Sequence, residues 1–316
     1  NKDSVKNLSV FVQQNGSECD FNNSDSWVIL SPIEQSIKRK IEAVGTPLKD
    51  WDIQINYGIK TGFNDAFIIS TEKRNEILAN CQTEDERTRT VELIRPILRG
   101  RDIKRYGYDW AGLYLIATFP SRHYDIEMYP AVKKHLLSFG IERLEQTGKT
   151  HIVNGEKVKA RKKTNNKWFE TQDSISYWED FDKPKIIWKI IGNRLGFALE
   201  KKRMVLNNAC YILTCQDGNL EYLEAVLNSN PILWYSFVTN MNKTGVGDMQ
   251  VGAQNINILP IPKQPKEENI ICKLVKEIHV NDPMVIKQIE NIISDIYGFS
   301  DEEQIFLSDF AKYIYQ

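Results

Sequence analysis

Asn56-Tyr-Gly-Ile-Lys-Thr-Gly-Phe-Asn-Asp-Ala-Phe-Ile-Ile-Ser70 joins a polar turn to an apolar run, and this stretch decides the fold. Gly58 and Gly62 permit backbone angles that other residues avoid, and polar side chains lie between and after them. The apolar run at residues 66–69 predicts a buried strand. Two interpretations stay open, a loop shaped to contact a ligand and an ordinary hairpin.

The segments around this stretch indicate a mixed α/β fold. Residues 51–57 alternate apolar with polar side chains, which is typical of a strand with one buried face. Ser31, with Glu34 three residues later, predicts a capped helix over residues 33–44. Further strands are predicted at residues 112–119, 185–191 and 209–214, and further helices at residues 72–80 and 129–137.

Helical spacing dominates from Leu220 onward, where apolar residues recur every three or four positions. The helices expected there lie at residues 220–227, 232–240, 267–279 and 283–297, with a last one capped by Ser300. We therefore predict three parts. They are a spacer or packing extension with one helix at residues 1–50, an α/β domain with a mixed sheet at residues 51–219, and a helical scaffold at residues 220–316.

The bulk composition is that of an ordinary globular protein. The 316 residues include Lys+Arg 41 and Asp+Glu 42, so the net charge of -1 indicates no particular partner. No apolar run is long enough to span a bilayer, and we expect a cytoplasmic protein without a membrane partner. Five scattered cysteines predict reduced thiols. The first residues lack an initiator methionine and a signal peptide, which predicts an internal fragment.

Motifs for catalysis or metal binding are weak. Asp102-Ile-Lys104 and Glu200-Lys-Lys202 are loose matches to a metal-dependent nuclease motif, but neither has a convincing upstream acid. Asn230-Pro-Ile-Leu233 carries only the first half of a methyltransferase tetrapeptide, and the four histidines lack metal-ligand spacing. We predict no catalytic residue, no metal site and no cofactor in this chain.

Positive charge concentrates between residues 149 and 167. Against Glu156, this window holds seven cations, Lys149, Lys157, Lys159, Arg161, Lys162, Lys163 and Lys167. Such a cluster can neutralise the phosphates of a nucleic acid, and the alternative is a solvated, flexible loop without a partner.

A second basic segment comprises Arg95, Arg99, Arg101, Lys104 and Arg105. Arginine can contact guanine edges or phosphates with two hydrogen bonds. Intramolecular pairing with Asp102 and Glu92 explains the same residues equally well, so both interpretations stay open.

The order of motifs resembles the TaqI-like C-terminal specificity domain, or target-recognition domain, of adenine-specific DNA methyltransferases and type IIG restriction-modification enzymes. The resemblance begins at residues 57–67 and 93–106. It continues through Lys167-Trp-Phe169 and residues 181–187, 207–212, 222–229, 254–262 and 296–299. It spans nearly the whole chain from Asp50, whereas residues 1–50 match poorly. The part from Leu220 resembles the helical regions of type I specificity subunits.

The resemblance implies that the chain binds double-stranded DNA. It also implies an upstream methyltransferase domain in the same polypeptide, which uses S-adenosylmethionine, and in some members a nuclease domain with Mg. We then expect phosphate contacts from all seven cations of residues 149–167. The candidates for base reading are Lys60, Thr61, Asn64, Arg99 and Arg101. Two alternatives remain, an unrecognised metal-dependent nuclease and a protein-interaction module with a basic loop.

Overall fold

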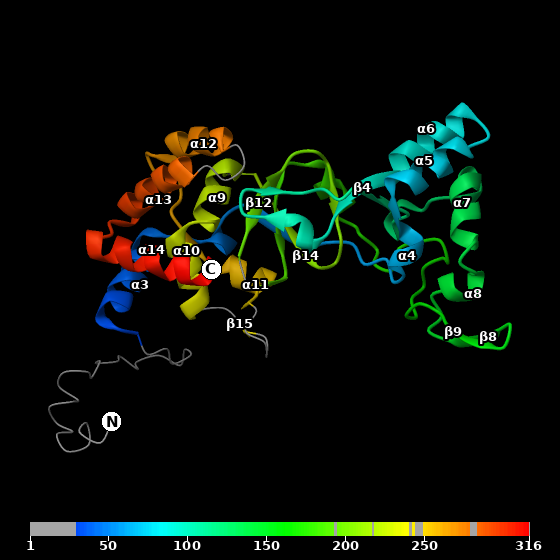
Figure 1. Ribbon diagram of the computed structural model, residues 1–316, viewed down its shortest axis with the longest axis horizontal. Helices are drawn as coiled ribbons and strands as arrows, with labels where there is room; N and C mark the ends of the chain where they lie inside the picture. The colour runs from blue at the N-terminus through cyan, green and yellow to red at the C-terminus, as the bar shows by residue number, and fades with distance from the viewer. Residues whose placement is uncertain are drawn as a thin grey trace, which may run out of the picture.

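The computed structural model describes residues 30–192, 195–216, 218–239, 242–243, 249–278 and 283–315. Helices occupy both ends of an elongated molecule and sheets lie between them (Figure 1). The mixed α/β fold expected from the sequence is confirmed. Within the described ranges, no helix has both the length and the apolar character needed to cross a bilayer.

The helices lie at Pro32–Val44 (α3), Asn64–Phe67 (α4), Thr71–Ala79 (α5), Glu84–Leu93 (α6), Pro130–Leu137 (α7), Ile141–Leu144 (α8), Leu220–Leu227 (α9), Asn230–Thr239 (α10), Ala253–Asn257 (α11), Glu268–Glu277 (α12), Pro283–Tyr297 (α13) and Asp301–Tyr315 (α14). The predicted capping box of α3 is present, because the backbone N–H of Ser31 donates to the Glu34 carboxylate over 2.8 Å. Ile37 and Ile41 then form the buried side of this helix.

Two four-stranded sheets form the middle of the molecule. One has the order β12-β10-β14-β2 and is antiparallel throughout, with strands Phe197–Glu200 (β12), Lys185–Lys189 (β10), Cys210–Cys215 (β14) and Ile53–Tyr57 (β2). The other has the order β13-β4-β7-β3, with strands Val205–Leu206 (β13), Ile94–Leu98 (β4), Leu113–Ile116 (β7) and Ile68–Ser70 (β3). It is a mixed sheet, since β13 runs parallel to β4 and the other neighbours are antiparallel.

The shorter strands lie at Thr46–Pro47 (β1), Ile103–Lys104 (β5), Gly107–Tyr108 (β6), Thr150–Val153 (β8), Glu156–Lys159 (β9), Ile191–Gly192 (β11), Asn242–Lys243 (β15), Met249–Gln250 (β16) and Pro260–Ile261 (β17). Single 3-10 turns at Gly100–Asp102 (η2) and Trp178–Asp182 (η5) connect the larger elements.

Two hydrophobic cores share strand β10. Ile186 and Trp188 belong to the core under the C-terminal helices, whereas Ile187 between them belongs to the core under α5, α6 and α7. Successive side chains of a strand point to opposite faces, so one strand can supply both cores. The division into residues 1–50, 51–219 and 220–316 stays a prediction. Ile37 of α3 shares a core with helices beyond residue 220.

Three local expectations differ from the structure. Residues 66–69 are not one strand, because α4 continues to Phe67 before β3 begins. The Thr61 hydroxyl donates to the Asn64 side chain over 2.7 Å and accepts from the N–H of Phe63, which closes a turn at the start of α4. Helix α6 was not expected, although Thr83 caps it by accepting from the N–H of Glu86. The basic window at residues 149–167 contains a hairpin, which is described next.

Candidate nucleic-acid interface

The basic window contains a two-stranded hairpin, β8–β9, which projects from one end of the molecule (Figure 1). Asn154 and Gly155 form its turn with φ of 49° and 85°. A tight turn of this kind requires positive φ at both central residues, and Asn-Gly is the sequence best suited to it. This dipeptide is the signal that would have predicted the hairpin from the sequence.

The two faces of the hairpin differ in composition. Residues that pair across the strands point to the same side, so Thr150 and Ile152 share a face with their partners Lys159 and Lys157. All four side chains are exposed, and we call them the outward face. The opposite face carries His151, Val153 and Val158, which are partly buried, and the acid Glu156. The outward face therefore combines two cations, a hydroxyl and an isoleucine without an acid.

Arg161 fixes the base of this hairpin from inside the protein. Its side chain is 4% exposed, and its guanidinium lies 4.9 Å from the centroid of the Phe67 ring. It donates hydrogen bonds of 2.6–2.8 Å to four backbone carbonyls, those of Thr61, Leu144, Trp168 and Glu170. Burial lowers the pKa of the guanidinium to about 10, and the nearby Glu170 carboxylate opposes this. Arg161 is therefore a structural residue, which corrects its expected role as a phosphate contact.

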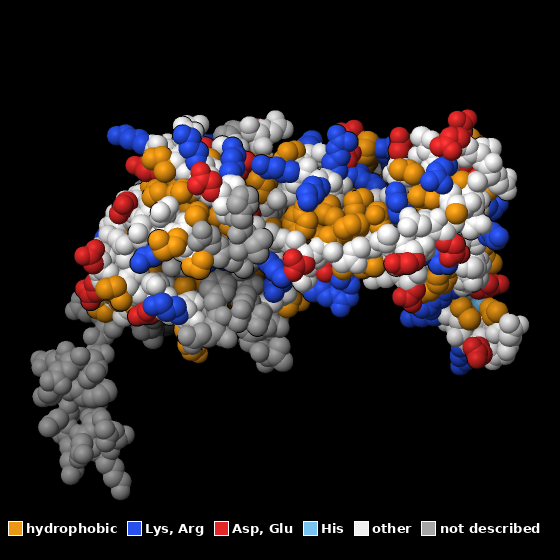
Figure 2. All heavy atoms as spheres, turned by 45° about the horizontal axis from the view of Figure 1, so that its top comes forward, with side chains coloured by type: hydrophobic (Ala, Val, Ile, Leu, Met, Phe, Trp, Pro, Cys, Tyr) orange, Lys and Arg blue, Asp and Glu red, His pale blue; other side chains and the backbone are white. Residues whose placement is uncertain are grey.

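The six lysines of the window have the opposite placement. All are exposed, and none forms an ion pair within the ranges that the structure describes; they are Lys149, Lys157, Lys159, Lys162, Lys163 and Lys167. Figure 2 shows the hairpin as a projection, with Lys and Arg side chains on it and where it joins the molecule. Exposed charges that form no ion pair are available to phosphates. We call these residues the lysine surface.

The loop around Lys60 lies beside the lysine surface. The N–H of Gln172 donates to the Lys60 carbonyl over 3.0 Å. The positive charges of Lys60 and Lys162 both interact with the carboxyl of Asp173. Burial raises the pKa of Asp173, and the two lysines oppose that change. Lys60 and Asn64 are exposed, whereas Thr61 is 1% exposed. Burial of Thr61 therefore removes it from the candidates for base reading.

The second basic segment is largely paired within the protein. The Nε and Nη2 atoms of Arg99 lie 3.0 Å and 2.7 Å from the two carboxylate oxygens of Asp102, so the intramolecular alternative is confirmed for this residue. The other ion pairs of the segment join Arg95 to Asp182, Lys104 to Asp109 and Arg105 to Glu290. Arg101 is exposed and remains a candidate for base reading.

The turn at residues 207–209 lies close to Gly58 and Gly100, which precede Lys60 and Arg101 in the chain. A Cβ added to Gly58 would lie 1.9 Å from the carbonyl oxygen of Asn207, so only glycine fits there. On the other side of the turn, a Cβ on Gly100 would lie 3.4 Å from the carbonyl oxygen of Ala209. Both glycines thus lie close to the backbone of this turn.

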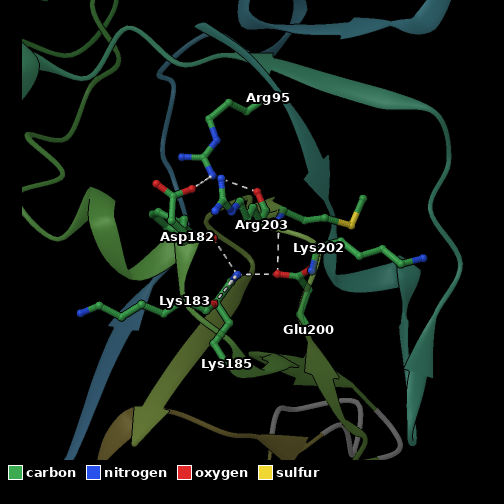
Figure 3. Close-up of polar contacts among 9 residues, drawn as sticks. Arg95, Asp182, Lys183, Lys185, Glu200, Lys202 and Arg203 are labelled. Atoms are coloured by element: carbon green, nitrogen blue, oxygen red, sulfur yellow. Dashed lines mark hydrogen bonds and ion pairs between the residues drawn. The ribbon is translucent and has the colours of Figure 1, made fainter. Parts of the chain in front are cut away.

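The acids of the two loose nuclease motifs, Asp102 and Glu200, are buried. Lys185 and Glu200, both 0% exposed, form a buried ion pair beside the contact of Arg95 with Asp182 (Figure 3). Asp102 is 5% exposed and is engaged by Arg99. Among the described residues, no three His, Cys, Asp or Glu side chains lie close enough together to hold a metal ion. A metal-dependent nuclease needs exposed acids. Asp102 and Glu200 are instead buried, and each is bound by a cation of the protein itself.

A family of specificity domains and a curated methyltransferase are both similar to this chain. The family of TaqI-like C-terminal specificity domains matches residues 95–261, more than half of the chain. Type II methyltransferase M.PaeR7I from Pseudomonas aeruginosa is 21% identical over 285 residues, which cover 90% of this chain and 45% of that protein. The chain thus spans less than half the length of this curated relative.

Two solved structures are similar to this chain. The type IIL restriction-modification enzyme MmeI, solved in complex with DNA, has a TM-score of 0.50 and 13% identity, covering 94% of this chain and 38% of that chain. The type IIG restriction endonuclease BpuSI has a TM-score of 0.47 and 11% identity, covering 84% of this chain and 33% of that chain. At 13% identity the likeness to MmeI concerns the fold alone.

Proposed function

Because the chain belongs to the family of TaqI-like C-terminal specificity domains, we propose that it binds duplex DNA at a specific sequence and positions an attached methyltransferase domain on an adenine. The methyltransferase relative supports the attachment, since this chain covers only 45% of it. In this proposal S-adenosylmethionine binds to the attached domain. That domain receives the adenine after it has rotated out of the duplex, because methyltransferases must reach the target base outside the stack.

The lysine surface is the observation that carries the proposal. Lysines that form no ion pair among the described residues would otherwise repel one another across a short span. Duplex DNA carries closely spaced phosphates and releases counterions when cations replace them. Phosphate contacts fix the protein on the duplex, and side chains that reach the grooves distinguish bases. Lys60, Asn64 and Arg101 are the exposed candidates for the second role.

The salt dependence of binding tests the proposal. If the lysine surface contacts about six phosphates, the affinity for duplex DNA falls about 1000-fold between 50 and 200 mM salt. Replacing Lys159, Lys162 and Lys163 with glutamine removes three of these contacts and lowers the slope of log affinity against log salt by about 3. Arg161 is left unchanged because its loss would disturb the fold.

Lys266→Gln, Lys273→Gln and Lys287→Gln together form the matched control. These lysines are also exposed but lie in the C-terminal part of the chain, so the slope stays that of the unchanged protein. Selection on randomised duplexes then identifies the bases that are read. A flat salt response, or no enriched sequence, contradicts the proposal. Metal-dependent cleavage by the chain alone would support the nuclease alternative, and binding to an acidic protein but not to DNA would support the interaction module.

A further inference from the structure

Ile152 is an exposed isoleucine in an unusual setting. Its side chain is 67% exposed, and it lies on the outward face of the hairpin opposite Lys157. Single exposed hydrophobic residues are common on protein surfaces and need no explanation by themselves. Here, however, the neighbouring positions of the face are Thr150, Lys157 and Lys159. The face thus places one exposed apolar side chain next to two lysines of the partner strand, so it can contact a ligand that has both negative charges and an apolar group.

The hairpin has the shape and the rigidity to enter a DNA groove. The major groove of B-form DNA admits a two-stranded β-ribbon. The two strands of such a ribbon lie about 5 Å apart. The N–H of Gly148 donates to the Arg161 carbonyl over 2.8 Å, and the N–H of Ala160 donates to the Lys149 carbonyl over 2.9 Å. Arg143 adds a hydrogen bond of 2.9 Å to the carbonyl of Lys159. These bonds hold the base of the ribbon and therefore its direction.

The chemistry of the outward face matches the major groove of a sequence that contains thymine. Phosphates line both sides of the groove, where lysine side chains can reach them. Inside the groove, the 5-methyl group of thymine is the apolar feature that distinguishes one base from the others. An aliphatic side chain beside Lys157 and Lys159 can pack against that methyl group.

We propose that the outward face of the β8–β9 hairpin enters the major groove and that Ile152 packs against the methyl group of a thymine in the target sequence. This inference rests on the proposed function, because it assumes that the chain binds duplex DNA. It specifies that the β8–β9 hairpin contacts the DNA, that the contact lies in the major groove and that the base is thymine. Ile152 is then a residue that determines specificity.

A thymine-to-uracil exchange tests the contact directly, because uracil differs from thymine only by the absent methyl group. In the duplex found by selection, each thymine is replaced in turn by deoxyuridine. At one position the affinity of the unchanged protein falls about three- to fivefold, the effect expected for one buried methyl group. Ile152→Ser lowers the affinity for the thymine duplex by a similar factor and is insensitive to the exchange at that position.

The matched control is Ile305→Ser, which changes an isoleucine on α14 that is 63% exposed. This variant keeps the uracil sensitivity of the unchanged protein. Equal uracil responses in Ile152→Ser and the unchanged protein at every position overturn the inference and leave the proposed function intact. A chain that binds no duplex at all fails the proposed function first. Because Ile152 is exposed, the unfolding midpoint of Ile152→Ser stays near that of the unchanged protein, which separates lost contact from lost folding.

Discussion

The guanidinium of Arg161 donates a hydrogen bond of 2.8 Å to the carbonyl oxygen of Thr61, a residue 100 positions earlier in the chain. This bond joins the turn before α4 to the base of the β8–β9 hairpin. The distance between Lys60 and the lysine surface is therefore set by bonds inside the protein. Both groups of proposed DNA contacts depend on one buried cation.

Arg161→Met lowers the free energy of unfolding by about 3 to 5 kcal/mol, because four carbonyls lose a charged donor in a buried place. Arg161→Lys recovers only part of this loss, since one ammonium group cannot replace a planar guanidinium with donors on three nitrogens. Urea unfolding measures both variants. Lys162→Met is the neighbouring control, and as an exposed change it stays within about 0.5 kcal/mol. Wild-type stability in Arg161→Lys would show that the four bonds are dispensable.

Removing one partner of the buried Lys185–Glu200 pair is expected to lower the free energy of unfolding. Burial lowers the pKa of Lys185, and Glu200 opposes that change. Lys185→Met leaves an unpaired carboxylate at a site that is 0% exposed and lowers the free energy of unfolding by about 3 to 5 kcal/mol. Glu200→Gln keeps an acceptor for the N–H of Met204. The double variant is less destabilised than the sum of the two single variants by about 1 to 3 kcal/mol.

Lys201 and Glu221 provide the exposed comparison for that experiment, because the Lys201 side chain is 52% exposed. Lys201→Met changes the free energy of unfolding by less than about 1 kcal/mol. If the single Lys185 and Glu200 variants add without coupling in chemical denaturation, the buried pair does not act as a unit.

Glu224 predicts a dependence of stability on pH. It is 4% exposed on α9 and accepts a hydrogen bond of 2.7 Å from the N–H of Leu199. Burial raises its pKa to about 7; Glu221 adds to the rise, and the Leu199 N–H and Lys201 oppose it. In the unfolded chain the carboxyl ionises near its ordinary pKa, so the folded state binds one more proton between about pH 4.5 and 7. Stability therefore falls as the pH rises through this window, by about 3 kcal/mol for this group.

Glu224→Gln removes this contribution, so its stability relative to the unchanged protein rises between pH 5 and pH 8 in urea unfolding. Glu221→Gln, on the same helix, gives no such trend between pH 5 and pH 8, because the pKa of Glu221 is lowered from its ordinary value of 4.5. Burial alone would raise the pKa of Glu221, but the hydrogen bond from Lys201 and its charge lower it. Its contribution to stability is present at neutral pH and is lost as the pH falls. Identical pH profiles for Glu224→Gln and the unchanged protein would contradict the assignment.

Substitution of Arg99 is expected to lower the free energy of unfolding, whereas substitution of Arg101 is expected to lower the affinity for DNA. Arg99→Ala leaves Asp102, which is 5% exposed, without its bidentate partner and lowers the free energy of unfolding by about 2 kcal/mol. Arg101→Ala changes stability by less than about 0.5 kcal/mol, because its side chain is exposed. It lowers the affinity for the selected duplex about tenfold if Arg101 contacts a base. The same loss on unrelated duplexes would assign Arg101 to phosphate instead.

The elements that the sequence predicts well are those whose evidence is local. The side chains of Ser31 and Glu34 meet within one helical turn, and the alternation of residues 51–57 is contained in one strand. Residues 66–69 are different, because a short apolar run suits a buried helix and a buried strand equally. There the hydrogen bond between Thr61 and Asn64 starts a helical turn before the strand.

The site was predicted less completely, because burial depends on distant segments. Charge alone places Arg161 with the six lysines around it, yet its four carbonyl partners come from separate parts of the chain. The sequence likewise gives no sign that the Thr61 hydroxyl is enclosed, because only the folded turn buries it. The hairpin itself carried a local signal in Asn154-Gly155, which the concentration of charge around it obscured.

The outward face of the hairpin belongs to neither hydrophobic core. Thr150, Ile152, Lys157 and Lys159 can therefore be replaced without loss of core packing, and the bonds that aim the hairpin come from backbone groups and from Arg161. Under the proposed contact with DNA, substitutions on this face change the bases that are read and leave the folding of the domain unchanged. The proposal thus makes the hairpin a position where recognition evolves independently of the scaffold.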